Sequence, residues 1–254
     1  MWGIPVPTHA LFVGLGVLAA LAVFVVEARR RGQTDERIVY VVIGALLGGA
    51  IFMRLGTWMQ HLDLRQNASF VEHWVYGNRS ILGGLVGAWL GVHVAKRWVG
   101  YRLRTGDLFA PAVALGMAVG RVGCLLTELP GTPTGSSYGI SLDRAAAARL
   151  GADAGAALHP SFVYEIAFHA AAFAVLWFYL RHRLTAPGET LTLYLAGYGV
   201  FRFLVEFVRG NEVVWEGLTR PQLFLLATVP MLLARVAWQA RKGVYRLNTV
   251  EVVS

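Results

Sequence analysis

The chain has 254 residues, of which 56% are hydrophobic and 15% are charged, and its mean hydropathy is +0.53. Soluble domains carry about 25% charged residues, so this composition excludes an ordinary soluble domain and predicts a helical membrane protein with several spans. A net charge of +8 would suggest a nucleic-acid partner in a soluble protein. Here we expect that charge to anchor cytoplasmic loops, with the bilayer as partner and no nucleic acid.

Seven continuous apolar stretches follow in chain order, each long enough to cross a hydrocarbon core of about 30 Å as a helix. They cover residues 8–26, 38–59, 80–99, 107–126, 160–180, 189–208 and 218–236. More polar segments, 60–79 and 127–159, follow the second and fourth stretches, and the later one holds turn residues and a short alanine-rich helix around 143–150. The sequence shows no repeat or low-complexity tract, so we predict one all-α domain over residues 1–254.

Lysine and arginine are distributed unevenly between the links that join these spans. With the N-terminus outside, and with Lys96, Arg97 and Arg220 at the span ends counted with the adjoining links, thirteen of the 23 fall in inner links, six in outer links and four within spans. Because positively charged loops stay on the cytoplasmic side, the sequence predicts an outer N-terminus and a cytoplasmic C-terminus. The two polar segments, 60–79 and 127–159, would then lie on the outer face.

Arginines inside the apolar spans are the first functional signal. A charged side chain in the hydrocarbon core of a membrane costs from ~3 to above 10 kcal/mol. An arginine found there is therefore a candidate functional residue. Arg121 and Arg202 both lie roughly 20 Å from the inner ends of their spans, and Arg54 reaches a similar level. Guanidinium groups at one depth favour a bound phosphate, which they hold through charge-assisted and potentially bidentate contacts. For Arg54 the alternative is an arginine that reaches the interface.

Tyr198, Arg202 and Glu206 are spaced four residues apart and therefore share one helix face. Glu206 is placed to pair with Arg202 and to hold its orientation, while Tyr198 offers a hydroxyl beside the same site. The alternative is a buried salt bridge that only ties helices together. Arg121 has the same alternative, through a pair with Glu165 or Glu128.

Candidate proton acceptors lie near the outer ends of the spans. Glu128 follows Arg121 by seven residues on the same helix face, and it is either a base or an arginine partner. His159 precedes the fifth span and is either a base or a histidine that ties a loop. We expect His169 to be a hydrogen-bonded core residue and Cys124 to pack as a small residue. The sequence shows no convincing metal cluster, and we expect no cofactor.

In chain order, these motifs resemble the prolipoprotein diacylglyceryl transferases of bacterial membranes. The resemblance rests on Gly120-Arg121-Val122-Gly123-Cys124, on Ser80-Ile81-Leu82-Gly83-Gly84-Leu85-Val86-Gly87, on His159-Pro160-Ser161 with Tyr164-Glu165, on Tyr198-Gly199-Val200-Phe201-Arg202 with Glu206 and Arg209, and on Gln222. It covers residues 8 to about 233. It implies a multi-pass enzyme of the bacterial cytoplasmic (inner) membrane whose site faces the outer leaflet.

The resemblance also implies a reaction. Diacylglyceryl would pass from phosphatidylglycerol to the lipobox cysteine thiol of a preprolipoprotein signal peptide, releasing glycerol-1-phosphate. Arg121 and Arg202 would bind the phosphate and stabilise the departing group, Tyr198 would line the glyceryl group, and Glu128 or His159 would take the thiol proton. The residues expected to bind substrate are Arg121, Arg202, Gly123, Gly83, Gly84, Arg54, Glu206, Arg209, Tyr164 and Glu165.

Departures from the family pattern leave two alternatives open. Many members have a histidine where this chain has Leu82, and a Tyr-Gly pair where it has His9-Ala10. The arginines are intact, but a side chain for proton handling or acceptor contact is lost. One alternative is a paralogue that uses the same donor on another acceptor. The other is a non-catalytic membrane protein that binds or transports lipid.

Overall fold

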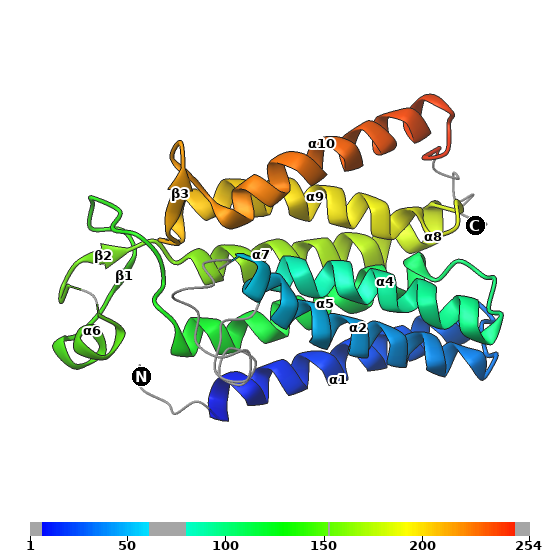
Figure 1. Cartoon of the computed structure of the whole chain (residues 1–254), viewed down its shortest axis with the longest axis horizontal. Helices are drawn as coiled ribbons and strands as arrows, with labels where there is room; N and C mark the ends of the chain where they lie inside the picture. The colour runs from blue at the N-terminus through cyan, green and yellow to red at the C-terminus, as the bar shows by residue number, and fades with distance from the viewer. Residues whose placement is uncertain (1–6, 61–79, 152, 247–254) are drawn as a thin grey trace, which may run out of the picture. The chain divides into compact units, whose positions relative to one another are not determined.

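The structure is a computed structural model that describes residues 7–60, 80–151 and 153–246. Long helices dominate the described part of the chain, as Figure 1 shows. Six helices within those ranges are long and apolar enough to cross a membrane, namely Thr8–Arg30, Arg37–Gly56, Gly106–Thr127, Ser161–Arg183, Glu189–Val208 and Arg220–Arg241. The chain is therefore a multi-pass membrane protein. The predicted segment 60–79 lies almost wholly outside the described residues.

The expected third span, 80–99, forms helix α4 (Ile81–Val99). It begins at Ser80, whose side chain accepts a hydrogen bond from the Gly83 amide, and it ends at Gly100 in the left-handed conformation that glycine adopts readily. This helix has 19 residues, and its last turns hold His93, Lys96 and Arg97, which lower its hydropathy, so it is not among the six apolar spans. Seven spans, and the orientation of the termini, stay predictions.

The helices group into two compact units, one comprising Met1–Ala28 with Arg104–Ser254 and the other Arg29–Leu103. In the smaller unit, α2 (Arg37–Gln60) packs against α4 through glycines. A Cβ added to Gly44 would lie 2.5 Å from the Gly91 carbonyl oxygen, and one added to Gly83 would lie 2.6 Å from that of Phe52. Only residues without a side chain allow backbones this close. The glycines of the α4 motif therefore serve helix packing.

The larger unit holds α1 (Pro7–Arg30), α5 (Gly106–Thr127), α7 (Ser161–Ala174), α9 (Glu189–Val205) and α10 (Arg220–Arg241). Past α7 the chain continues as the π-helix η1 (Val175–Leu180) and the short α8 (Arg181–Arg183), and past α9 as the 3-10 turn η2 (Glu206–Val208). Half of the apolar window of α5 is buried. This helix therefore forms much of the interior of the unit, and Arg121 lies on it.

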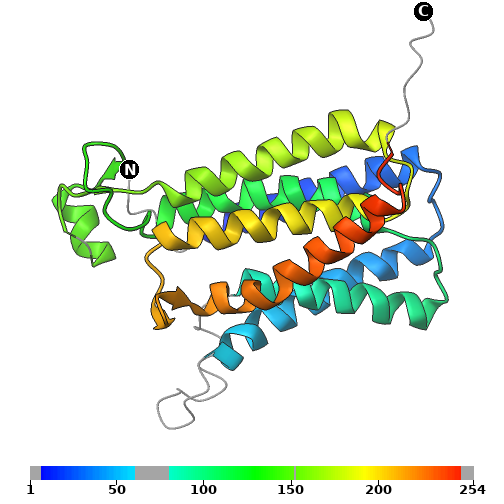
Figure 2. The ribbon, with the colours of Figure 1, turned by 90° about the horizontal axis from the view of Figure 1, so that it is seen from above.

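Short irregular segments gather at one end of these helices. Strands β1 (Ile140–Ser141) and β2 (Ala157–Leu158) pair antiparallel around α6 (Arg144–Leu150), and β3 (Val213–Trp215) pairs with β4 (Leu218–Thr219). Figures 1 and 2 both place α6 and β3 at this end and α8 at the opposite end. The alanine-rich helix is confirmed. The predicted all-α fold does not include these two small sheets. Strands of two and three residues are too short to leave an alternating pattern in the sequence.

The seventh span begins later than predicted. Leu218 and Thr219 belong to β4, and α10 starts at Arg220. Thr219 accepts a hydrogen bond from the Gln222 amide while the Gln222 side chain accepts from the Thr219 amide, which is a reciprocal cap. The apolar character of Leu218 extended the predicted span across this cap. The helix also runs on to Arg241, beyond the predicted end at residue 236.

The end of the larger unit that holds α8 carries its own polar cluster. Glu189 is 2% exposed, and it accepts hydrogen bonds from Arg235 at 2.5 Å, Gln239 at 3.3 Å and Tyr245 at 3.0 Å. Burial, followed by that hydrogen bond, raises the pKa of Tyr245 to about 12, so its hydroxyl remains a donor at neutral pH. These contacts join the start of α9 to the end of α10.

Candidate functional site

Glu165 on α7 is fully buried, and its carboxylate lies between two arginines. Arg121 of α5 forms an ion pair with one carboxylate oxygen, and Arg209, just after η2, donates to the other. The side chains of Arg121 and Arg209 are only 5% and 11% exposed. Both guanidinium groups also lie near the face of the Phe162 ring, with centroid distances of 5.9 and 4.6 Å. Sequence reasoning did not identify Phe162 as a site residue.

Arg202 and Glu206 form a second buried pair one helical turn apart, as their spacing predicts. Glu206 is 2% exposed, and its other oxygen accepts from the Asn211 side chain at 2.6 Å and from the Thr219 hydroxyl at 2.9 Å. Glu206 is therefore held by three donors from separate positions. Sequence reasoning did not identify Asn211 or Thr219 as site residues. Thr219 and Gln222 form a helix cap, and this helix-start pattern is the signal in the sequence that points to Thr219.

Tyr198 connects the two pairs. Its ring is 1% exposed, and the charges of Glu165, Arg121 and Arg202 all act on its hydroxyl. Arg202 likewise acts on the carboxylate of Glu165. The hydroxyl of Tyr198 makes no hydrogen bond of ordinary geometry within the described residues. Arg121 and Arg202 thus lie within electrostatic range of the same tyrosine and the same glutamate.

The five charged side chains of this arginine cluster (Arg121, Arg202, Arg209, Glu165 and Glu206) carry three positive and two negative charges. In the described part of the chain, the Nε–H groups of Arg121 and Arg209 are buried without a hydrogen-bond partner. Buried donors of this kind are costly unless a partner is supplied. An excess positive charge with spare guanidinium donors is suited to an anion such as a phosphate monoester or diester.

The candidate bases lie in different surroundings. Nδ1 of His159 lies 3.4 Å from the Tyr164 hydroxyl, and the His159 amide donates to the Thr132 carbonyl. Glu128 is the residue after α5, and its carboxylate lies 3.6 Å from Nε2 of His9. Both predicted bases are therefore near the end of the unit that holds α6. His169 is confirmed as a buried core residue, with Nδ1 3.0 Å from the Tyr194 hydroxyl.

The remaining predicted residues occupy separate places. Gly123 packs against α1, where an added Cβ would lie 3.2 Å from the His9 carbonyl oxygen. Gly83, Gly84 and Arg54 belong to the smaller unit, and their part in substrate binding stays a prediction. A cavity of about 120 Å³ lies beside Glu206, Asn211, Thr219 and Gln222. Arg121 and Arg202 do not line that cavity.

Comparisons with known proteins agree on one family. The family model described as "Prolipoprotein diacylglyceryl transferase" matches residues 1–239. A Bordetella bronchiseptica protein named phosphatidylglycerol–prolipoprotein diacylglyceryl transferase is 31% identical, over 91% of this chain and 89% of its own. A Leifsonia xyli protein of the same name is 31% identical, over 94% of this chain and 76% of its own length. A Clostridium perfringens protein named phosphatidylglycerol–prolipoprotein diacylglyceryl transferase 2 is 28% identical, over 89% of this chain and 87% of its own length.

Proposed function

The chain belongs to the prolipoprotein diacylglyceryl transferase family, and we propose that its buried arginine cluster binds and activates the phospholipid donor. The chain is a transferase that moves a diacylglyceryl group from phosphatidylglycerol to a prolipoprotein. In this proposal, the phosphate of phosphatidylglycerol meets the guanidinium groups of Arg121 and Arg202. The observation that carries the proposal is the excess positive charge of the cluster, with its unpartnered buried Nε–H donors.

The reaction needs no nucleophile from the enzyme, because the substrate supplies the attacking sulfur. It does need the negative charge on the departing phosphate to be stabilised. The sulfur of the lipobox cysteine attacks the glyceryl carbon that bears the phosphate ester, a carbon–sulfur bond forms, and the carbon–oxygen bond breaks. Glycerol-1-phosphate departs with the electron pair, and the thiol proton passes to a base. Guanidinium groups held in place by Glu165 and Glu206 stabilise the charge on the departing phosphate without reorganising during the reaction. Glu128 and His159 are the candidate bases.

Two further features complete the proposal. We infer that the site faces the outer leaflet of the bacterial cytoplasmic membrane. The excess of lysine and arginine in the links predicted to be cytoplasmic supports this orientation. Arg209, Tyr164, Gly123, Gly83, Gly84 and Arg54 are proposed to contact the donor or the lipobox segment. Leu82 favours, as the second candidate, a paralogue that uses the same donor with a different acceptor.

The test is mass spectrometry of a lipobox peptide incubated with purified protein and phosphatidylglycerol. We expect a thioether-linked diacylglyceryl product from the wild type, and a rate at least 100-fold lower for Arg121→Ala and for Arg202→Ala, the scale of losing one preorganised donor. Arg121→Lys keeps the charge but loses the bidentate geometry, and it should also be impaired.

Arg183→Ala is the matched control, because Arg183 lies in α8 at the opposite end of the unit and packs on Tyr179. It should retain wild-type activity. Donor cleavage without a peptide product would favour the paralogue. Folded protein that binds phosphatidylglycerol but never cleaves it would support a lipid-binding role and exclude the transferase.

A further inference from the structure

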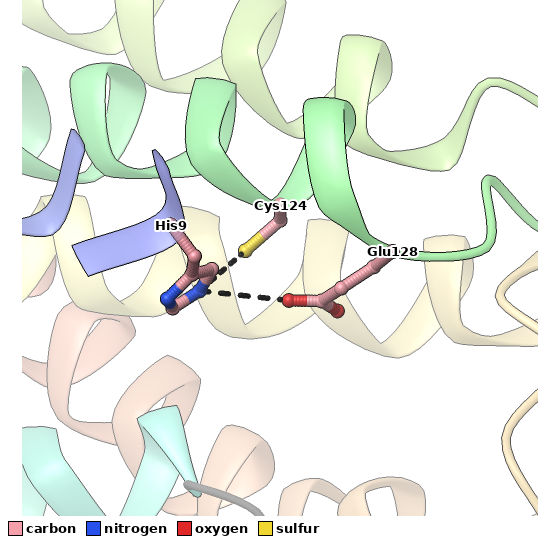
Figure 3. Close-up of side chains that lie close together, drawn as sticks. All are labelled: His9, Cys124 and Glu128. Carbon is pink, nitrogen blue, oxygen red and sulfur yellow. Dashed lines mark hydrogen bonds and ion pairs between the residues drawn. The ribbon is translucent and has the colours of Figure 1, made fainter. Parts of the chain in front are cut away.

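Three side chains with metal-binding donor atoms converge, as Figure 3 shows. One of them, Cys124, contacts Arg121 of the arginine cluster. His9 comes from the first turn of α1, Cys124 from the last turn of α5, and Glu128 from the residue that follows α5. Nε2 of His9 lies 3.5 Å from Sγ of Cys124 and 3.6 Å from a carboxylate oxygen of Glu128. All three donor atoms lie within 4.8 Å of one another.

Glycine packing brings these residues together. An added Cβ at Gly16 would lie 2.6 Å from the Gly116 carbonyl oxygen, and one at Gly123 would lie 3.0 Å from Cβ of Phe12. α1 and α5 therefore meet at small residues, which fixes His9 over the last turn of α5. Cys124 lies in the last turn of α5, and Glu128 follows four residues later, directly after the helix ends, and the side chains of both reach that imidazole.

We propose that His9, Cys124 and Glu128 form a binding site for a divalent transition metal of the zinc class. Imidazole nitrogen, thiolate and carboxylate are the ligands that Zn²⁺ takes, at about 2.0–2.3 Å and in tetrahedral geometry. That geometry separates neighbouring donor atoms by roughly 3.3–3.6 Å, which the two distances from His9 match. Three protein ligands leave one coordination position for an exogenous ligand, the arrangement of catalytic rather than structural zinc sites.

The local charge and exposure fit such an ion. A thiolate and a carboxylate neutralise the two positive charges of the metal, so the filled site adds no net charge beside Arg121, whose Nη1 lies 3.8 Å from Sγ of Cys124. Arg121 itself is paired with Glu165. Cys124 is 7% exposed, whereas the side chains of His9 and Glu128 are 29% and 44% exposed. Those two ligands give an ion access to the buried sulfur.

The test is Co²⁺ titration of purified, metal-stripped protein in detergent, without lipid donor or peptide. Co²⁺ substitutes for Zn²⁺, and a cobalt–thiolate bond produces a charge-transfer absorption band. We expect saturation at about one Co²⁺ per chain, with this band, and displacement by Zn²⁺. Cys124→Ser should abolish the band. His9→Ala and Glu128→Gln should weaken Co²⁺ affinity by at least tenfold, while exposed His182→Gln should leave it unchanged.

Three outcomes would overturn the proposal: no saturable Co²⁺ binding, a thiolate band that survives in Cys124→Ser, or affinity unaffected by both His9→Ala and Glu128→Gln. In those cases the three side chains form only a hydrogen-bonded cluster. Thermal unfolding of each variant shows whether it is folded. Because metal binding is measured without substrates, this inference and the proposed transferase mechanism fail independently.

Discussion

At the residue scale, Glu165 is the carboxylate on which two buried guanidinium groups depend. Removing one partner of a buried ion pair costs about 3–5 kcal/mol, because the other charge is left uncompensated. We therefore expect Glu165→Gln to lower the free energy of unfolding by that amount, measured by thermal unfolding in detergent. Glu212→Gln is the control, since Glu212 is 70% exposed in its pair with Arg220 and such pairs contribute about 0–1 kcal/mol.

The same variant also reports on anion binding. In Glu165→Gln the cluster has three arginines and one glutamate, so a bound phosphate replaces part of the missing negative charge. Soluble glycerol phosphate should therefore raise the unfolding temperature of this variant more than that of the wild type. Equal stabilisation of the two proteins would contradict an anion site at these arginines.

Tyr198 gives a prediction that separates function from packing. Its buried hydroxyl makes no ordinary hydrogen bond in the part of the chain that is described, so Tyr198→Phe should leave the unfolding temperature unchanged or slightly higher. If the hydroxyl contacts the glyceryl group in the transition state, kcat should fall by about tenfold or more while KM stays near the wild-type value. Unchanged kcat would assign Tyr198 to packing alone.

Residue spacing predicted part of this site and missed the rest for a physical reason. Arg202 and Glu206 lie on one helix, so their pairing follows from helix geometry, and the charge of Arg121 stands out in an apolar span. The contact between His9 and Cys124 joins residues 115 positions apart. No local pattern encodes it, because it depends on how glycines let α1 approach α5.

At the element scale, the close approach of α2 and α4 predicts a sharp effect of small substitutions. A Cβ at Gly91 would overlap the backbone carbonyl of Gly44, and overpacking of this kind costs about 1–3 kcal/mol. Gly91→Ala should therefore lower the unfolding temperature. Gly14→Ala is the matched control, because nothing lies within 4 Å of its added Cβ. Equal unfolding temperatures would show that the two helices move apart without cost.

The apolar pattern located the long helices, and for some of them it also gave their ends. The predicted stretch 107–126 and the observed α5 differ by one residue at each end. The pattern failed at the short hairpin of β3 and β4, whose turn uses Glu216 and Gly217 with φ of 43° and 77°. Such a turn is set by backbone conformation rather than by hydrophobic periodicity, so Leu218 was assigned to the following span.

At the scale of the larger unit, two polar clusters lie at opposite ends of the helices. The arginine cluster is near the end that holds α6 and β3, whereas Glu189 gathers its partners at the end that holds α8, and Figures 1 and 2 agree on these ends. Within this unit, the second end also holds Arg104, Arg181, Arg183 and Arg241. Membrane insertion should therefore place the arginine cluster toward the outer leaflet.

Cysteine labelling tests this orientation, because Cys124 is the single cysteine of the chain. In a Cys124→Ser background, Ser137→Cys introduces a thiol in an exposed stretch near α6, and Lys242→Cys introduces one just after α10. A membrane-impermeant maleimide should label Ser137→Cys in intact cells and Lys242→Cys only after permeabilisation. The reverse pattern would place the arginine cluster near the cytoplasmic leaflet, where an acceptor on the outer surface has no access to it.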